Sequence, residues 1–244
     1  MVNQFLTHSQ KVQNIIKGFN LTKSLFVSSI LTGDAYTGKK SLIRYLFPLI
    51  PYADGSDQKN IEQLLENQNE LVIFNFEKLS NIDNLDFDNK RIIAVSNYIS
   101  NEKTIDSLFA FIYHMPPLRE RPEDIPLLIE HFMKEVKSNL MIEKTFTIDA
   151  ETLDISDNIH SLRRSLYQQA FIHSCNSRGI QSILYRYLYE NMEGNNDYKD
   201  YLPLYEKPLI EAGLAKFGSQ LKLSEILGIN RNTLRKKIHE LGID

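Results

Sequence analysis

A string of nine residues, GDAYTGKKS at positions 33–41, has the glycine and lysine spacing of a phosphate-binding loop. In such a loop, successive backbone N–H groups and the N-terminus of the next helix surround the phosphates, while the lysine supplies positive charge. Lys40 stands where the common loop carries Ser or Thr, and Ser41 comes one place late for the usual metal hydroxyl. The candidate nucleotide-binding residues are Gly33, Thr37, Gly38, Lys39, Lys40 and Ser41. The candidate cofactor is ATP or ADP with Mg²⁺.

A second polar set lies near the end of the chain, where residues 206–244 read as three short helices. We expect Pro208 in the first turn of the first helix, because a first turn accepts proline. Ser219 is expected to cap the second helix, and Asn230 is expected to cap the third. The three helices therefore predict a small all-α domain.

The last of these helices has an apolar face and a basic face. Leu234, Ile238 and Leu241 recur at helical spacing and define the buried face. The opposite face and its flanks carry the candidate DNA-binding residues, which are Arg231, Asn232, Thr233, Arg235, Lys236 and Lys237. Such side chains can neutralise phosphates and pair with base edges in the major groove. Two helices joined by a glycine turn, with the polar face on the second, predict a helix-turn-helix that binds double-stranded DNA.

The elements that must position the loop alternate between apolar strands and amphipathic helices. Strands are expected at SLFVSSILTG, ELVIFNF and KRIIAVSN, and helices at SLIRYLFPLI and IEQLLENQ. After PPLRERPEDIP the pattern is amphipathic helices, in IPLLIEHFMKEVKSNL, NIHSLRRSLYQQAFIHS and SILYRYLYENM. This order predicts a parallel α/β core followed by a helical unit. The polar segment EGNNDYKDY is expected to be a linker.

The bulk composition is that of a folded protein. The 244 residues are 42% hydrophobic and 24% charged, which is ordinary for a globular chain. The net charge of −3 excludes a protein that is basic throughout, but residues 206–244 carry seven lysines and arginines against five aspartates and glutamates. The single Cys175 cannot form an internal disulfide, and the first residues do not resemble a signal peptide. We therefore expect a cytoplasmic protein with no membrane partner.

Three motifs, in order, resemble those of the bacterial NtrC-like AAA+ enhancer-binding regulators that act on sigma-54 polymerase. GDAYTGKK is similar to the family's GESGTGKE loop, MPPLRERPEDIPLLIEHFM to the signature that ends its α/β core, and LGINRNTLRKKIHELGI to its Fis-type recognition segment. The resemblance implies an AAA+ P-loop parallel sheet core, a helical lid and a C-terminal all-α Fis-type helix-turn-helix. It divides the chain into a core at 1–126, a lid at 127–193, a linker at 194–203 and a DNA-binding domain at 204–244. The sensory domain that often precedes this architecture is not expected.

Several positions depart from the family pattern. Phe76 and Glu77 stand where the family has Asp-Glu, so the metal-binding aspartate is replaced and Glu77 is the retained remnant of the acidic strand. Tyr36 replaces a family glycine, and His160 replaces the arginine of the lid motif. The arginine fingers have no counterpart, because residues 92–118 contain no arginine. Since these parts hold the metal ion and stabilise transition-state charge, we expect hydrolysis to be lost, leave nucleotide binding open and assign no metal ligands.

The family reaches the polymerase with a GAFTGA loop, and no such string can be written between Gly38 and Glu77. We therefore expect a sequence-specific DNA-binding regulator, homodimeric or of higher order, that is not an enzyme and does not use the sigma-54 mechanism. Two alternatives stay open. One is a nucleotide-switched ATPase completed by a substitute residue. The other is a regulatory partner of a full-length sigma-54 activator, so that RNA polymerase or a full-length relative is the candidate partner.

Overall fold

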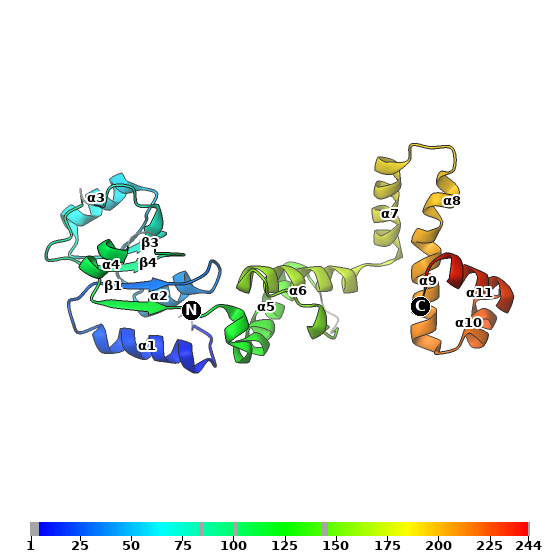
Figure 1. The fold of residues 1–244 in the computed structure, drawn as a ribbon, viewed down its shortest axis with the longest axis horizontal. Helices are drawn as coiled ribbons and strands as arrows, with labels where there is room; N and C mark the ends of the chain where they lie inside the picture. The colour runs from blue at the N-terminus through cyan, green and yellow to red at the C-terminus, as the bar shows by residue number, and fades with distance from the viewer. Residues whose placement is uncertain (1–4, 83–84, 100–101, 143–145, 244) are drawn as a thin grey trace. The chain divides into compact units, whose positions relative to one another are not determined.

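The protein consists of two compact units, a first unit at Met1–Ser174 and a second unit at Cys175–Asp244 (Figure 1). The computed structural model describes residues 5–82, 85–99, 102–142 and 146–243. Within these residues the first unit holds the sheet and its helices, whereas the second unit is built from helices. Each unit has hydrophobic clusters of its own.

The first unit begins with an α/β core and continues into a helical part. Its strands are β1 (Ser29–Thr32), β2 (Tyr52–Asp54), β3 (Glu70–Phe74), β4 (Arg91–Val95) and β5 (Phe111–His114). Its helices are α1 (Gln10–Thr22), α2 (Lys39–Leu46), α3 (Gln58–Asn67), α4 (Glu102–Leu108), α5 (Ile125–Asn139) and α6 (Asn158–Ser174). Short 3-10 helices lie at Phe76–Lys78, Leu118–Glu120, Pro122–Asp124 and Ala150–Thr152.

The sheet is parallel, with strand order β2-β3-β4-β1-β5. Parallel strands need cover on both faces, and successive side chains of a strand point to opposite faces. In β1, Leu31 packs in a cluster with Phe19 of α1 and Leu42 of α2. Its neighbour Ile30 packs in a second cluster with Ile61 of α3. The sheet therefore lies between two helical layers, as Figure 1 shows, and the predicted parallel α/β core is confirmed.

The helical part of the first unit packs around α5 and α6. Its core includes Leu118 from the segment after β5, Leu128 and Val136 from α5, and Leu162 and Leu166 from α6. The amphipathic pattern predicted both helices. Because α6 starts against the phosphate-binding loop, this helical part covers the loop in the manner expected of a lid.

The second unit consists of five helices among the described residues. They are α7 (Ser177–Asn191), α8 (Asp197–Tyr201), α9 (Pro203–Phe217), α10 (Gln220–Leu227) and α11 (Arg231–Glu240). Ile210, Leu223 and Leu234 form the buried centre, one from each of the last three helices. Gly213 permits this packing, since a Cβ there would lie 2.4 Å from a methyl group of Leu223. The small core depends on a close approach of α9 to α10.

Four details of this unit differ from the sequence-based expectations. The predicted linker at 194–203 contains α8, and α7, which was assigned to the lid, groups with the second unit. The helix that was expected to begin near Pro208 begins at Pro203 instead, and Pro208 lies inside it. Ser219 occupies the N-cap position of α10 without a side-chain capping bond.

Among the described residues, none of the helices has the length and hydropathy of a membrane-spanning segment.

Candidate functional site

The phosphate-binding loop connects the end of β1 to the first residue of α2, as its motif predicts. Gly33 has φ +136°, and a Cβ there would lie only 2.5 Å from the carbonyl oxygen of Met115. Gly38, directly before α2, has φ +94°. Both conformations favour glycine, because other residues meet steric strain at positive φ. The hydroxyl of Thr37 closes the turn by donating to the carbonyl oxygen of Asp34 at 2.9 Å.

Lys39 is buried beneath this loop, and the residue is only 4% exposed. Its Nζ donates to the carbonyl oxygens of Gly33, at 2.6 Å, and Asp34, and to Oδ1 of Asn97 at 3.2 Å. Burial lowers the pKa of Lys39 to about 8, although the negative charges of Glu77 and Asp34 act in the opposite direction. The ammonium group is thus held at the loop, among acceptors that a phosphate oxygen can replace.

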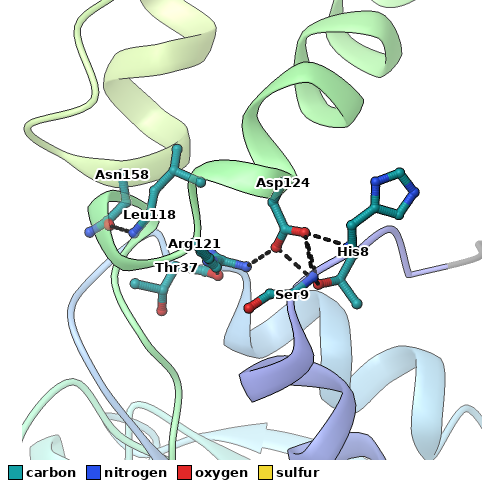
Figure 2. Close-up of polar contacts among 8 residues, drawn as sticks. His8, Ser9, Thr37, Leu118, Arg121, Asp124 and Asn158 are labelled. Carbon is teal, nitrogen blue, oxygen red and sulfur yellow. Dashed lines mark hydrogen bonds and ion pairs between the residues drawn. The ribbon is translucent and has the colours of Figure 1, made fainter.

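An ion pair between Arg121 and Asp124, whose side chains are both buried, holds the loop at Thr37 (Figure 2). Arg121 donates from Nη2 to the carbonyl oxygen of Thr37 and from Nη1 to Asp124, at 3.2 Å. Asp124 also accepts the backbone N–H groups of His8 and Ser9, which precede α1. The segment after β5, which resembles the family signature, therefore ties the start of the chain to the loop. The motif indicated this segment but not the residues that it contacts.

Asn158, the first residue of α6, links the lid to the core. Its Oδ1 accepts the backbone N–H of Leu118 at 2.7 Å, a bond drawn in Figure 2, and its Nδ2 donates to the carbonyl oxygen of Ala35 at 2.9 Å. Asn158 adopts φ +53°, a conformation that asparagine tolerates better than most residues. Sequence reasoning singled out position 160 of this motif and missed Asn158, whose signal was an asparagine at the start of a helix.

Two departures from the family pattern lie against each other. The ring of Tyr36 in the loop contacts the ring of His160 in α6, with a centroid distance of 4.7 Å. The carbonyl oxygen of Tyr36 also accepts the backbone N–H of Ile159 at 3.2 Å. Tyr36 has φ +58°, which a glycine would adopt without strain. The loop and the lid are therefore joined by a contact that a glycine and an arginine would not make.

A cavity of about 920 Å³ opens beside the loop. Its lining residues are Ala35, Tyr36, Thr37, Gly38, Lys39, Lys40, Ser41, Asn75, Lys78, Val95, Asn97, Ile159, His160, Arg163, Arg164 and Tyr167. Among these described residues, five are lysine or arginine and none is aspartate or glutamate. Five of the six predicted loop residues line the cavity, and Gly33 does not. The arrangement suits a polyanionic ligand that reaches from the loop to α6.

Glu77, the predicted remnant of the acidic strand, does not line the cavity. Its carboxylate accepts the backbone N–H of Asn97 at 3.2 Å and the Nδ2 group of the same residue at 2.8 Å. Asn97 in turn accepts from Lys39. Glu77 therefore acts on the site through Asn97 and through its charge, and sequence reasoning did not identify Asn97.

The predicted basic face of the last helix is exposed on α11. The Oδ1 atom of Asn230 caps this helix by accepting the N–H of Asn232 at 2.8 Å, as predicted, and Leu234 is fully buried. The exposed members of the candidate set are Arg231, Asn232, Thr233, Arg235 and Lys236. Lys237 differs, because its Nζ pairs with Oε1 of Glu206 on α9 at 2.5 Å and the side chain is partly buried. The structure thus places Lys237 against α9 and not with the exposed set.

The comparisons with known proteins agree with the motifs. Residues 201–241 match the model of the family described as bacterial regulatory protein, Fis family. The DNA-binding transcriptional regulator NtrC of Azospirillum brasilense is 31% identical over 53% of this chain and 34% of its own length. NtrC of Rhizobium meliloti (strain 1021) is 32% identical over 63% of this chain and 42% of its own length. The chain therefore spans less than half the length of these relatives.

A solved structure matches nearly the whole chain. The crystal structure of NtrX from Brucella abortus in complex with ATP aligns with a TM-score of 0.57 and 16% sequence identity, covering 99% of this chain and 70% of that one. This likeness shows the fold. Together with the sheet topology and the Fis-family match, it confirms the predicted parallel sheet core with helices, in a fold shared with NtrX, and the C-terminal Fis-type helix-turn-helix.

Proposed function

We propose that this chain, which is an NtrC-like AAA+ protein with a Fis-type helix-turn-helix domain, binds double-stranded DNA at specific sequences and regulates transcription from them. The observation that carries this proposal is the exposed face of α11. Arg231, Asn232 and Arg235 project from a helix that is capped at Asn230 and anchored through buried Leu234. Arginine and asparagine can read guanine and adenine edges in the major groove. Enrichment of a preferred duplex from a random library by the intact chain tests the proposal.

We also propose a homodimer or a higher oligomer, because helix-turn-helix proteins read paired half-sites through two-fold symmetry. The support is α7, in which none of the residues is buried. Ile180, Ile183, Leu184 and Tyr187 recur at helical spacing and are all exposed. A second copy of α7, packed against this stripe, would bury it.

The first unit is proposed to bind ATP or ADP without hydrolysing it. Binding is supported by the loop geometry and by the basic cavity. Loss of hydrolysis is supported by Phe76, which the family resemblance aligns with the metal-binding aspartate and which is 3% exposed within an apolar cluster. Transcription regulation that does not use the sigma-54 mechanism is supported by the stretch between Gly38 and Glu77. This stretch is occupied by α2, β2, α3 and β3 with short connections, and so offers no long inserted loop.

Lys39→Ala is expected to weaken ATP binding by about tenfold or more, because a hydrogen bond to a charged group contributes about 1.5–3 kcal/mol. The measurement is calorimetric titration of the intact chain with ATP. Lys59→Ala is the matched control, since Lys59 is an exposed residue of α3 outside the cavity. Equal losses in both variants would count against a nucleotide site at the loop.

The pH dependence of the same titration gives a second readout of Lys39. Since its pKa is about 8, the ammonium form is present below that pH and is lost as pH rises through it. A bound phosphate favours the ammonium form, so ATP affinity should fall above about pH 8, by up to about tenfold per pH unit. The Lys39→Ala variant should lack this dependence.

A further inference from the structure

We infer that the cavity beside the loop binds the phosphates of its nucleotide without a divalent cation, with basic side chains of the chain itself neutralising the phosphate charge. This inference rests on the proposed nucleotide binding and states which groups of that same site neutralise the phosphate charge. It departs from the magnesium that the fold family implies. The inference is based on the oxygen atoms and the charged groups of the residues that line the cavity.

Magnesium in nucleotide sites is held by oxygen ligands in near-octahedral geometry, usually one or two carboxylates together with the phosphates and water. The cavity does not offer such a set. Among the described residues that line it, the oxygen atoms belong to hydroxyl, amide and backbone groups and none belongs to a carboxylate. Directly after β3, Asn75 lines the cavity with an amide group, and Phe76, the first residue of the next 3-10 helix, packs into the apolar cluster.

The carboxylates at the end of β2 and after β3 are held by other groups. Glu77 accepts two hydrogen bonds from Asn97. Asp54, at the end of β2, accepts from Nδ2 of Asn75 at 2.5 Å and from the hydroxyl of Ser56 at 2.6 Å. Neither carboxylate lines the cavity. A metal ion would have to break these hydrogen bonds to gain either of them as a ligand.

Positive charge takes the place of the metal. Lys40 occupies the position directly after Lys39, where the common phosphate loop has its metal-binding hydroxyl. Its ammonium group lies 5.6 Å from the ring centroid of Phe74, at the end of β3. Lys40 therefore lies at the end of β3, and a cation bound there would meet repulsion from its ammonium group.

The lid supplies further cations to the same cavity. Arg163 and Arg164 of α6 line it, and their present partners are Glu135 and Asp154. These are partly exposed pairs, which contribute little to stability, so a phosphate can compete for the guanidinium groups. An arginine side chain can bind two phosphate oxygens with two parallel N–H donors. This contact neutralises phosphate charge without a metal ion.

The test is calorimetric titration of the intact chain with ATP, once in excess Mg²⁺ and once in EDTA. The inference predicts saturable binding in EDTA that is at least as tight as in Mg²⁺. Affinity that is higher in Mg²⁺ by about tenfold or more, which is about 1.4 kcal/mol, would overturn the inference and leave the proposed nucleotide binding intact. Absence of binding in both buffers would overturn the proposed nucleotide binding as well.

Two variants sharpen this test. Lys40→Ser removes the cation and introduces the hydroxyl that the common phosphate loop carries, so it should lower affinity in EDTA by about tenfold, as expected for a lost charge-assisted contact. The matched control is Lys59→Ser, which removes the same charge from α3 and should leave both affinities unchanged. Equal affinities of Lys40→Ser and the unchanged chain in EDTA would contradict the role assigned to Lys40.

Discussion

Replacing Arg121 by alanine is expected to lower the free energy of unfolding of the first unit by roughly 3–5 kcal/mol, the usual cost of removing one partner of a buried ion pair. The loss should be large because Arg121 and Asp124 are both buried, so the variant leaves the Asp124 carboxylate buried without its cation. The carbonyl oxygen of Thr37 would also lose its donor. Urea unfolding of the intact chain, followed by far-ultraviolet circular dichroism, measures the effect.

Arg119→Ala is the matched control for this prediction. Arg119 lies two residues earlier, is 63% exposed at its side chain and pairs with Asp34 at 3.6 Å. Exposed pairs of this kind contribute about 0–1 kcal/mol, so the midpoint of unfolding should change little. If both variants unfold at the same urea concentration, the proposed stabilising role of Arg121 between Asp124 and the carbonyl oxygen of Thr37 is contradicted.

Arg235→Ala is expected to weaken binding to the preferred duplex by about 5- to 150-fold, since a bidentate base contact contributes about 1–3 kcal/mol of discrimination. If Arg235 contacts phosphate instead, the slope of log affinity against log salt should fall by about one unit. Fluorescence anisotropy at several salt concentrations separates these two roles. In either case the expected change follows from an exposed guanidinium on the free face of α11.

Two lysines, Lys207 and Lys237, serve as controls for the DNA-binding measurement on Arg235→Ala. Lys207→Ala removes one charge from α9, where Lys207 pairs with Glu211, and should leave both affinity and salt slope unchanged. Lys237→Ala should lower the stability of the second unit without changing the slope, because Lys237 pairs with Glu206. Equal losses of affinity in Arg235→Ala and Lys207→Ala would mean that α11 is not the contacting helix.

The parts of the fold that could be predicted from sequence have strong local patterns. β1, β3 and β4 are continuous apolar runs because both of their faces are buried, and such runs stand out from polar surroundings. β5 was not predicted, since it lies at the edge of the sheet and its side chains alternate in exposure. β2 is only three residues long. Helix α1 did have a periodic signal that was overlooked, with Val12, Ile15 and Phe19 on its buried face.

The same distinction applies to the candidate site. The loop residues could be predicted because adjacent residues in the chain encode the turn and the helix start. The contacts of Arg121 with Thr37 and of Asn158 with Ala35 join residues that are 84 and 123 positions apart, so they depend on the folded chain. The pairing of Lys237 with Glu206 also depends on the folded chain, because a single helix cannot indicate which flank will pack against α9.

The most direct test of the proposed function compares the affinity of the intact chain for its enriched duplex and for a duplex of the same composition in scrambled order, at one physiological salt concentration. Sequence-specific regulators bind their sites about 10³-fold or more tightly than other DNA. We predict a ratio of that order, which should decrease in Arg235→Ala. Equal affinities for the two duplexes at every salt concentration would contradict the claim that this chain recognises DNA sequence.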